Sequence, residues 1–526
     1  MNDIRKPMSE EYAQYLRDES QKTGTASLIA FPKTTEETAA LLALCNQERL
    51  PVTVQGARTG IAAGCVPAGG LILNLSRMNR VLGCRRLESG SFAFRVQAGV
   101  ILSEFAGAVE SKRFSISGWD EDSVDACRML MKGGDFFFSP DPTERSATLG
   151  GMAACNASGA RSYKYGSVRP YIVALRAVLA DGRPLSLRRG ACFAQGRRLN
   201  VSLDDGGCIE ATLPSYRMPD TKNTSGYYAS PDMDAIDLLI GSDGTLAVIT
   251  ELEVTLLPQP GCIWGMLAFL PGREEALDYV LRLRAMDEGA LASIEYFDAG
   301  ALEILRRQRT GNAVFASLPE FSESAGAAVY TELHCEEAKE ALALLGRAGE
   351  ALEAAGGREE ETLVARTRSD LLALQFFRHA IPESVNLLIA QRKKECAVIT
   401  KLSTDMAVPD RHLAHMMEYY HDALDREGLQ SAVWGHIGDN HLHINILPRN
   451  AAEYDKGRAL YTLWAKEVCR LSGAVSAEHA VGKLKVDYLE IMYGKAHIDE
   501  MRALKKAFDP LCLLGRGNIF AGRGAM

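Results

Sequence analysis

Short apolar runs separated by glycine-rich turns characterise the first half of the chain. A helical pattern covers residues 36–47, with Thr34 and Thr35 as candidate N-terminal caps. Apolar runs with the spacing of β-strands recur through this half, at residues 52–54, 71–75, 92–96 and 173–179. This mixture of strands and short helices predicts an α+β domain.

The pattern changes along the second half of the chain. Residues 185–237 are rich in Gly, Ser, Asp and Pro, which predicts a long excursion rather than a core element. Beyond Pro258, amphipathic helices rich in Ala, Leu and Glu are predicted at 273–283 and 336–355, and they alternate with strands. This shift places a domain boundary near residues 257–260.

Composition and charge narrow the range of functions. The chain has 526 residues, of which 47% are hydrophobic and 24% charged, so we expect about two to four globular domains. The net charge is -8 and the basic residues are scattered, so nucleic acid is not expected as a partner. None of the 12 cysteines forms a C-x-x-C pair, which argues against an iron–sulfur cluster within the chain.

Hydropathy also bears on the cellular location. No apolar run approaches the roughly 18 residues that a membrane span needs, and the N-terminus lacks the apolar stretch of a signal peptide. We therefore expect a cytoplasmic protein with reduced thiols, without a transmembrane segment. Any association with a membrane would come from a partner.

Three glycine-bearing segments are candidates for contact with a nucleotide cofactor. Loop 55–60 follows a predicted strand, and its backbone N–H groups can cradle a pyrophosphate, although most such loops are simply turns. Residues 140–159 contain Pro-Asp-Pro-Thr, Ala-Thr-Leu-Gly-Gly and Asn-Ala-Ser-Gly, whose small side chains suit a planar ring lying on backbone. Segment 240–246, Ile-Gly-Ser-Asp-Gly-Thr-Leu, then leads into a β-rich run. Their order and spacing argue against unrelated surface turns.

This region resembles the FAD-binding domain of the vanillyl-alcohol oxidase (PCMH-type) superfamily. The resemblance implies that loop 55–60 holds the FAD pyrophosphate, that residues 140–159 line the flavin, and that 240–246 closes over the cofactor. That family usually has Glu where this chain has Asp243. The implied FAD contacts are Gln55, Gly56, Ala57, Arg58, Thr59, Gly60, Pro140, Thr148, Gly150, Gly151, Asn156, Gly159, Gly244, Ile249 and Asn518.

Polar residues alternate with apolar ones in a predicted strand of the second half. From residue 441 the sequence His-Leu-His-Ile-Asn-Ile places His441, His443 and Asn445 on one face. A Gly-Asp-Asn break separates this strand from His436, so a turn there can bring His436 beside His443. Two imidazoles can then converge.

A carboxylate that could complete such a site occurs downstream, where Glu478 is followed by His479 among small residues. Imidazoles with a carboxylate suit zinc, manganese or iron, and an open coordination position would make the site catalytic. A lone histidine is more often exposed or a satisfied core residue. Here four of the 10 histidines fall in two short segments.

The second half resembles the FAD-linked oxidase C-terminal domain of D-lactate and D-2-hydroxyglutarate dehydrogenases and glycolate oxidase subunits. Its metal motif G-H-x-G-D-x-x-x-H-x-N matches residues 435–445, and its E-H-x-x-G signature matches residues 478–482. The resemblance implies that His436, His443 and Glu478 bind a divalent metal, that Asn445 contacts substrate, and that His479 is the general base.

The chain departs from this family at two places. The family usually has Gly-Asn where the chain has Asn440-His441, so His441 is an additional metal ligand, a group behind the ligands, or an exposed residue. The terminal motif D-P-x-x-x-x-N-P-G-K is altered at residues 509–518, which leaves open whether Asn518 replaces the lost Asn-Pro pair near the flavin.

A substrate carboxylate requires a cation. The family carries basic residues facing the substrate where this chain has Arg378 and Lys401. Arginine suits bidentate binding of a carboxylate. Both side chains could instead be solvated surface charges, which is the commoner position for these residue types.

The resemblance implies an α+β fold: a two-part PCMH-type FAD-binding domain at 26–258, then an α/β substrate (cap) domain with an antiparallel sheet at 259–505. A 1–25 extension precedes them, and segment 506–526 returns to the flavin. We expect an FAD-dependent dehydrogenase that oxidises a small D-2-hydroxy acid, D-lactate being favoured, and passes electrons to an iron–sulfur protein or electron-transfer flavoprotein. The alternatives are an oxidase of another alcohol and a non-catalytic flavin relay subunit. A homodimer is left open.

Overall fold

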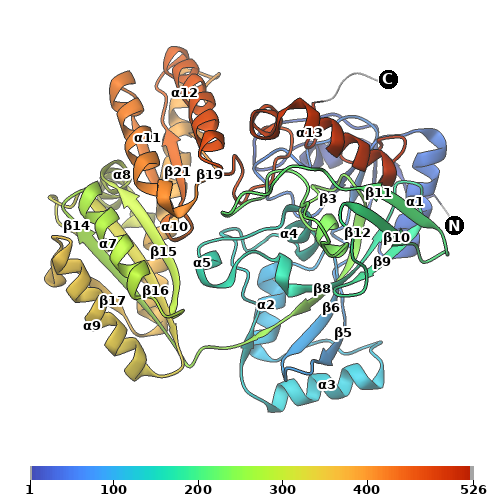
Figure 1. The fold of residues 1–526 in the computed structure, drawn as a ribbon, viewed down its shortest axis with the longest axis horizontal. Coiled ribbons are helices and arrows are strands. Elements are labelled where there is room, and N and C mark those ends of the chain that lie inside the picture. The colour runs from blue at the N-terminus through green and yellow to red at the C-terminus, as the bar shows by residue number, and fades with distance from the viewer. Residues whose placement is uncertain (1–2, 522–526) are drawn as a thin grey trace.

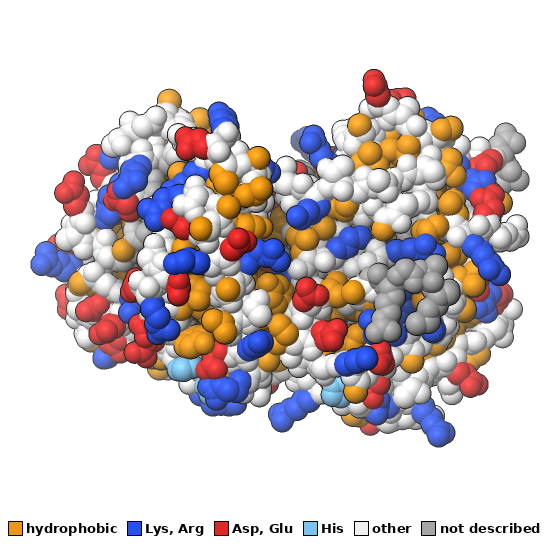
Figure 2. Space-filling model, turned by 90° about the horizontal axis from the view of Figure 1, so that it is seen from above, with side chains coloured by type: hydrophobic (Ala, Val, Ile, Leu, Met, Phe, Trp, Pro, Cys, Tyr) orange, Lys and Arg blue, Asp and Glu red, His pale blue; other side chains and the backbone are white. Residues whose placement is uncertain are grey.

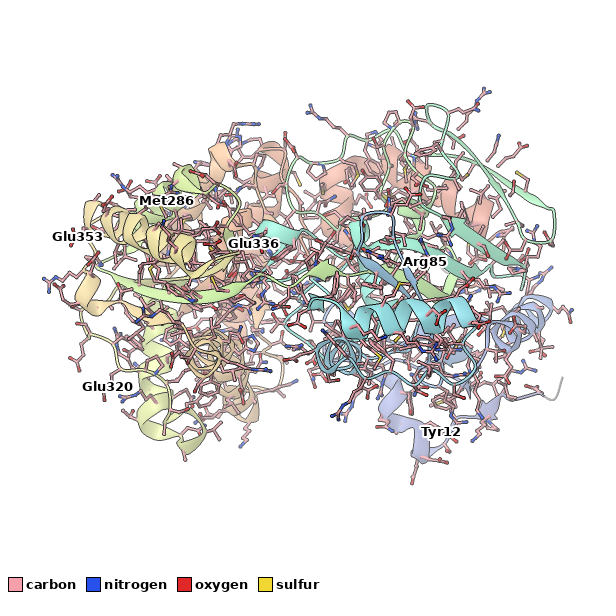
Figure 3. The ribbon with its side chains drawn as sticks, turned by 90° about the horizontal axis from the view of Figure 1, so that it is seen from below. Tyr12, Arg85, Met286, Glu320, Glu336 and Glu353 are labelled. Atoms are coloured by element: carbon pink, nitrogen blue, oxygen red, sulfur yellow. The ribbon has the colours of Figure 1, made fainter. Side chains whose placement is uncertain are left out.

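The computed structural model describes residues 3–521, which form two halves lying side by side (Figure 1). One half, coloured blue to green, contains the N-terminal sequence, and the other, coloured yellow to orange, contains most of the later sequence. From above, the halves are two lobes with a notch between them (Figure 2). From below, Tyr12 and Arg85 lie on one half and Glu320, Glu353 and Met286 on the other (Figure 3).

The first half is built on two sheets. The smaller sheet has the order β1-β2-β4-β3, in which β2, β4 and β3 are parallel. The larger sheet has the order β5-β6-β12-β8-β9 and is antiparallel. Their strands are β1 (Lys6–Pro7), β2 (Leu28–Ala30), β3 (Val52–Gln55), β4 (Leu71–Asn74), β5 (Val81–Arg86), β6 (Phe92–Gln97), β8 (Ile172–Val178), β9 (Pro184–Arg188) and β12 (Val248–Thr255).

Several helices accompany these sheets, and the first lies where the sequence pattern predicts a helix at residues 36–47. The first helix is α1 (Thr35–Glu48), and the side chain of Thr34 caps it by accepting a hydrogen bond from the backbone N–H of Glu37. The hydroxyl satisfies one of the free N–H groups of the first helical turn. The other main helices of this half are α2 (Leu102–Ser111), α3 (Glu121–Lys132), α4 (Leu149–Cys155) and α5 (Ser162–Tyr165).

The predicted excursion at 185–237 is more ordered than its composition suggests. It contains an antiparallel hairpin, β10 (Arg198–Ser202) and β11 (Cys208–Thr212), whose alternate residues are buried. Residues 213–235 then run without a helix or strand and reach the other half of the molecule through Lys222, which contacts Glu478.

The second half is one large antiparallel sheet with the order β17-β14-β16-β15-β20-β21-β18, and β19 also pairs with β21. Helices cover both faces, because one apolar cluster joins it to α7, α9, α11 and α12 and another to α8 and α10. The strands are β14 (Cys262–Leu270), β15 (Leu291–Asp298), β16 (Ala327–Cys335), β17 (Leu363–Ala365), β18 (Leu402–Ser403), β19 (Met406–Ala407), β20 (Ser431–His436) and β21 (His441–Ile446), and the helices are α7 (Arg273–Met286), α8 (Ala299–Gly311), α9 (Ala338–Ala354), α10 (Arg368–Glu395), α11 (Leu413–Glu427) and α12 (Ala451–Arg470).

The chain finally returns to the first half through α13 (Val486–Phe508), drawn in red across the top of that half (Figure 1). Its residues Leu489, Met501 and Phe508 belong to the apolar cluster of the first half. Leu514 then pairs with Val52 of β3. The mixed fold with antiparallel sheets is confirmed. The predicted domain bounds stay predictions.

Candidate active site

A β-hairpin brings the predicted histidines together. Strands β20 and β21 pair so that His436 lies directly opposite His441. The 3-10 turn Ile437–Asp439 and the left-handed Asn440 (φ 54°) reverse the chain between them. The imidazole centroids of His441 and His443 are 4.5 Å apart, and those of His436 and His443 are 5.6 Å apart. His436 and His443 therefore converge, and the His441 ring lies close to both.

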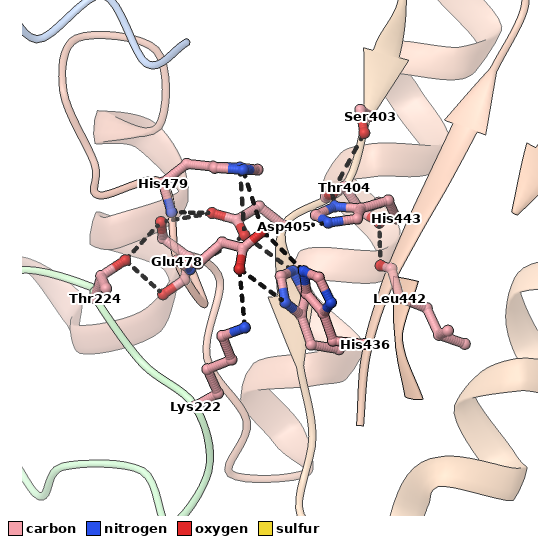
Figure 4. Close-up of polar contacts among 12 residues, drawn as sticks. Lys222, Thr224, Ser403, Thr404, Asp405, His436, Leu442, His443, Glu478 and His479 are labelled. Atoms are coloured by element: carbon pink, nitrogen blue, oxygen red, sulfur yellow. Dashed lines mark hydrogen bonds and ion pairs between the residues drawn. The ribbon is translucent and has the colours of Figure 1, made fainter. Parts of the chain in front are cut away.

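Glu478 faces this group of imidazoles from a loop beyond α12 (Figure 4). Its Oε1 lies 3.3 Å from Nε2 of both His436 and His443. One ligand atom from each of His436, His441, His443 and Glu478 falls within a span of 4.8 Å. This span and donor set fit a divalent metal such as zinc, manganese or iron.

Polar groups behind two of these imidazoles fix their orientation. Nδ1 of His436 donates to Oε1 of Glu295 on β15 at 2.7 Å. Nδ1 of His443 donates to the carbonyl oxygen of Thr404 at 3.0 Å. Metal-binding histidines are commonly oriented in this way, with the second ring nitrogen bound to a carboxylate or carbonyl. In both residues Nε2 is thereby directed at Glu478.

Charged side chains around Glu478 set its ionisation. Burial alone raises the pKa of this carboxyl, but the Lys222 ammonium and His436 hold the pKa well below its usual value. Nζ of Lys222 donates to Oε2 of Glu478 at 2.8 Å. Burial lowers the pKa of His436, but Glu295 and Glu478 outweigh it and raise the pKa to about 9. The Glu478 carboxylate is therefore ionised, and it attracts positive charge into the site.

His479 lies at the edge of this cluster. Its Nε2 is 3.3 Å from Oε1 of Glu478, and its ring stacks on His443 with centroids 5.5 Å apart. Its side chain keeps 28% of its surface exposed, whereas the rings of His436 and His441 are nearly or fully buried. A proton acceptor beside the ligand group and open to solvent is suitably placed for a general base.

Asp405 anchors the loop that carries Glu478 and His479. Its carboxylate accepts hydrogen bonds from the backbone N–H groups of both residues, at 3.2 and 3.1 Å. It also accepts from the Ser476 hydroxyl at 2.9 Å and pairs with Lys485. These donors satisfy the buried carboxylate and fix the loop against the hairpin.

Arg378 on α10 lies behind the same site. Its Nε donates to Oε2 of Glu295 at 2.9 Å, so Glu295 links Arg378 to His436. Arg378 also lines a cavity of about 610 Å³ between the two halves. The first half contributes Pro140 and Arg161 to the lining of this cavity, and the second contributes Glu332. Arg378 therefore lies at the cleft, and its contact with a substrate stays a prediction.

Asn445 and Lys401 are the other two predicted substrate contacts. The side chain of Asn445 is fully buried, and its amide donates to the backbone oxygen of His443 at 2.9 Å. Its Oδ1 has no hydrogen-bond partner among the described residues. Lys401 precedes β18, makes no ion pair within residues 3–521, and burial lowers its pKa to about 8. Its role stays a prediction.

The segments predicted to hold FAD pack against one another. A Cβ on Gly56 would lie 2.3 Å from Oγ1 of Thr148, so loop 55–60 touches the start of α4. A Cβ on Gly159 would lie 1.9 Å from the carbonyl oxygen of Asp141. Only glycine permits these approaches. The predicted contacts Gly150, Gly151 and Asn156 lie in or directly after α4, and Ile249 lies in β12.

Several polar atoms on these segments are free to bind a ligand. The buried Ser139 Oγ, Asn156 Oδ1 and Ser158 Oγ have no hydrogen-bond partner in the described part of the chain. Buried polar groups without a partner are uncommon in folded proteins. A cofactor with many polar atoms, such as FAD, would satisfy them. The residues present therefore fit the group.

The C-terminal segment joins this region through Asn518. Its Nδ2 donates to the carbonyl oxygens of Gly64 at 2.9 Å and Asp243 at 3.0 Å. Nζ of Lys483 donates to its Oδ1 at 2.6 Å. Asp243, in the segment predicted to close over the cofactor, accepts from the backbone N–H of Gly482 at 2.6 Å. Whether Asn518 contacts FAD itself stays a prediction.

Sequence reasoning missed Glu295, Asp405, Thr404 and Lys222. Glu295 and Asp405 lie in strand or near-strand segments far from the histidine motif, and only sheet pairing brings them close. Lys222 belongs to the irregular excursion, where no local pattern distinguishes it. The one available signal was an acidic residue within an otherwise apolar strand pattern, as at Glu295, because such residues are seldom buried without a partner.

Comparison with known proteins agrees with this geometry. The family described as "FAD binding domain" matches residues 26–119 and 129–188, and "FAD linked oxidases, C-terminal domain" matches residues 265–519. Glycolate oxidase subunit GlcD of Bacillus subtilis is 27% identical over 94% of this chain and 88% of its own. D-lactate dehydrogenase of Anaerostipes hadrus is 27% identical over 92% and 87%. D-2-hydroxyglutarate dehydrogenase of Xanthomonas citri pv. viticola is 28% identical over 96% and 92%.

Solved structures of similar fold extend the comparison. A p-cresol methylhydroxylase structure with substrate bound has a TM-score of 0.66 at 12% identity, covering 98% of this chain and 94% of its own. An alkyldihydroxyacetonephosphate synthase structure has a TM-score of 0.62 at 15% identity, covering 97% and 82%. These two likenesses concern the fold alone. With both domain families matched in order, the chain belongs to the FAD-linked oxidoreductases that join an FAD binding domain to an FAD-linked oxidase C-terminal domain.

Proposed function

We propose that this protein oxidises a D-2-hydroxy acid, with D-lactate favoured, to the corresponding 2-oxo acid. The observation that carries the proposal is the position of His479, which lies beside a convergent group of imidazoles and a carboxylate. Relatives named D-lactate dehydrogenase, D-2-hydroxyglutarate dehydrogenase and glycolate oxidase subunit support this substrate class at 27–28% identity. The relatives have different named substrates and low sequence identity, so the choice of the individual acid is itself proposed.

His436, His443 and Glu478 would hold the metal. When bound, a divalent metal supplies Lewis-acid polarisation of the substrate hydroxyl, and FAD supplies the acceptor for a hydrogen and its electron pair. Glu295 and the carbonyl oxygen of Thr404 keep Nδ1 of the two histidines occupied, so that each Nε2 faces Glu478. These groups hold the donors in place before substrate arrives.

His479 takes the proton of the substrate hydroxyl at Nε2, the nitrogen that faces the ligand group. FAD held by loop 55–60 and residues 140–159 would supply the acceptor for the α-hydrogen and its electron pair, which would leave the alcohol as a ketone. A general base with this role contributes about 10²- to 10⁴-fold to the rate. Asp405 fixes the loop that carries His479 through the backbone N–H of that residue.

Arg378 and Lys401 would bind the substrate carboxylate, and Asn445 would contact the substrate. Arg378 suits this role because it lines the cleft between the halves while its Nε remains bound to Glu295. Burial lowers the pKa of Lys401 to about 8, so its charge depends on pH. The free Oδ1 of Asn445 is an acceptor that a hydroxyl could satisfy.

Electrons would leave reduced FAD for an external acceptor, such as an iron–sulfur protein or an electron-transfer flavoprotein. The 12 cysteines of the chain include no C-x-x-C pair. A cluster within this chain therefore has no ligand motif of that kind.

A substrate panel with an artificial electron acceptor tests the proposed reaction. We expect turnover with D-2-hydroxy acids and formation of one 2-oxo acid for every two electrons delivered to the acceptor. L-isomers and aryl alcohols serve as the comparison substrates. Turnover of an aryl alcohol without any 2-hydroxy acid would overturn the proposal, as would a flavin that no member of the panel reduces.

A further inference from the structure

The imidazole of His441 is buried in the site, and its nearest charged neighbours are the carboxylates of Asp405 and Glu478. Its side chain is fully inaccessible, and neither ring nitrogen makes a hydrogen bond within residues 3–521. Nδ1 lies 4.0 Å from Oε2 of Glu478, and Nε2 lies 3.0 Å from Oδ1 of Asp405, an ion-pair contact without a hydrogen bond. A buried imidazole in this state requires an explanation, because buried polar groups are nearly always satisfied.

The three imidazoles of the hairpin share one arrangement. In His436 and His443 one nitrogen is held by a carboxylate or carbonyl oxygen, and the other faces Glu478. His441 repeats this arrangement, since Nε2 faces the carboxylate of Asp405 and Nδ1 faces Glu478. Metal-binding histidines characteristically have one nitrogen on the metal and the other on such an oxygen.

We propose that His441 is a fourth protein ligand, so that the metal is bound by three imidazoles and the Glu478 carboxylate. The inference rests on the proposed function only in requiring that the site holds a metal. One ligand atom from each of the four residues lies within 4.8 Å of the others, so the set can meet at one ion. Catalytic zinc sites usually have three protein ligands, and this site would have one more.

Asp405 is a weaker candidate for a ligand than His441. Asp405, Glu478 and His479 also place ligand atoms within 4.8 Å of one another. The Asp405 carboxylate, however, is already bound by Lys485, by the Ser476 hydroxyl and by two backbone N–H groups. Binding a metal would break this set, whereas His441 has no hydrogen bond to lose.

The test compares metal binding in the FAD-loaded protein and in two histidine variants. X-ray absorption of the bound metal counts imidazole ligands, and competition with a chelator measures metal affinity. We expect three imidazoles in the wild type and two in His441→Asn, with affinity lowered by more than about 100-fold. Loss of a group behind a ligand costs only about 10- to 100-fold. Glu295→Gln provides that smaller loss as an internal reference.

His334→Asn is the matched control. His334 is likewise buried on a strand and lies beside a carboxylate, with Nε2 2.7 Å from Oε1 of Glu332, but it is no part of the ligand group. Its variant should keep three imidazoles and wild-type affinity. If His441→Asn fails to fold, the imidazole count of the wild type decides alone.

The outcomes separate this inference from the proposed function. A wild-type protein that binds a metal through two imidazoles, or a His441→Asn variant with unchanged count and affinity, would overturn the fourth ligand and leave the proposed reaction intact. A protein that takes up no zinc, manganese or iron would overturn the metal itself, and the fourth ligand with it.

Discussion

His479 is the side chain on which the proposed chemistry most depends. His479→Asn removes the proton acceptor but leaves the backbone N–H that binds Asp405 at 3.1 Å. We expect this variant to keep bound FAD and to be reduced by D-lactate about 10²- to 10⁴-fold more slowly. Stopped-flow absorbance of the flavin under anaerobic conditions measures this rate.

The control for this substitution is His415→Asn. His415 is an exposed histidine that also pairs with a carboxylate, Glu467, at 2.7 Å. The flavin of this variant should be reduced by D-lactate at the wild-type rate. A His479→Asn variant reduced as fast as the control would remove His479 as the base.

Lys401 leads to a prediction about how substrate binding depends on pH. Burial lowers its pKa to about 8, so its positive charge is present below pH 8 and is lost as the pH rises through that value. If Lys401 binds the substrate carboxylate, the KM for D-lactate should rise about tenfold between pH 7 and pH 9.

Lys401→Arg distinguishes this effect from other titrations. Arginine keeps its charge throughout the range, so the KM of this variant should stay level. Parallel pH profiles for the two proteins would show that another group binds the carboxylate. The sequence identified this lysine by resemblance, but its environment, and hence its pKa, depends on residues packed around β18 that no local pattern specifies.

At the scale of elements, the hairpin β20–β21 fixes the relative positions of His436, His441 and His443. Gly435 has φ 142°, and a Cβ there would lie 2.9 Å from the carbonyl oxygen of His441 and 3.1 Å from the backbone nitrogen of His443. Gly435→Ala should therefore displace the strand that carries both histidines. We expect metal affinity to fall and the free energy of unfolding to fall by about 1–3 kcal/mol.

Gly428→Ala is the control for backbone strain. Gly428 has φ 62°, and a Cβ there would meet no atom within 4 Å. This variant should lose about 1–2 kcal/mol of stability from the left-handed backbone alone. Its metal affinity, measured by the same chelator competition, should be unchanged. Equal metal affinities in the two alanine variants would contradict the role of the hairpin.

The elements also show what the sequence could and could not predict. Strict alternation in residues 441–446 placed His441 and His443 on one face, because side chains of a strand alternate. The hairpin register was not predicted: it pairs His436 with His441, which depends on the three-residue 3-10 turn. Glu295 was missed because β15 meets β20 through pairing between residues far apart in the chain.

At the scale of the whole molecule, the cleft lies between the segment predicted to line the flavin, at 140–159, and the second half of the chain. Arg161 of the first half donates from Nε to Oε1 of Glu332 in the second at 2.7 Å. Burial alone raises the pKa of Glu332, but Arg161 holds it far below its usual value. Arg161→Met would leave this buried carboxylate without its cation and should lower the free energy of unfolding by about 3–5 kcal/mol.

Calorimetry of the FAD-loaded protein measures this effect. The matched control is Arg282→Met, which removes an exposed pair with Asp278 and should change stability by about 0–1 kcal/mol. Similar melting temperatures for the two variants would contradict a structural role for the contact across the cleft. The sequence predicted two domains, but this contact required the arrangement of both halves.

The surfaces on which helices pack were less predictable than the helices and strands themselves, because such packing depends on residues far apart in the chain. The strand β3 and helix α1 follow from local apolar spacing and a cap, and both were predicted within a few residues. The position of α13 was not predicted, because most of its buried apolar residues pack on the first half, while Tyr488 and Met492 near its start also contact the second half. Amphipathic spacing identifies a helix but not the surface it covers.

The most direct test of the account is the visible spectrum of the purified, FAD-loaded protein before and after D-lactate is added without oxygen. We expect flavin bands that D-lactate bleaches and L-lactate does not. A site that fixes both the hydroxyl and the carboxylate of the substrate would present the α-hydrogen of only one isomer to the flavin. Bands that no D-2-hydroxy acid bleaches, or a folded protein that takes up no FAD, would contradict it.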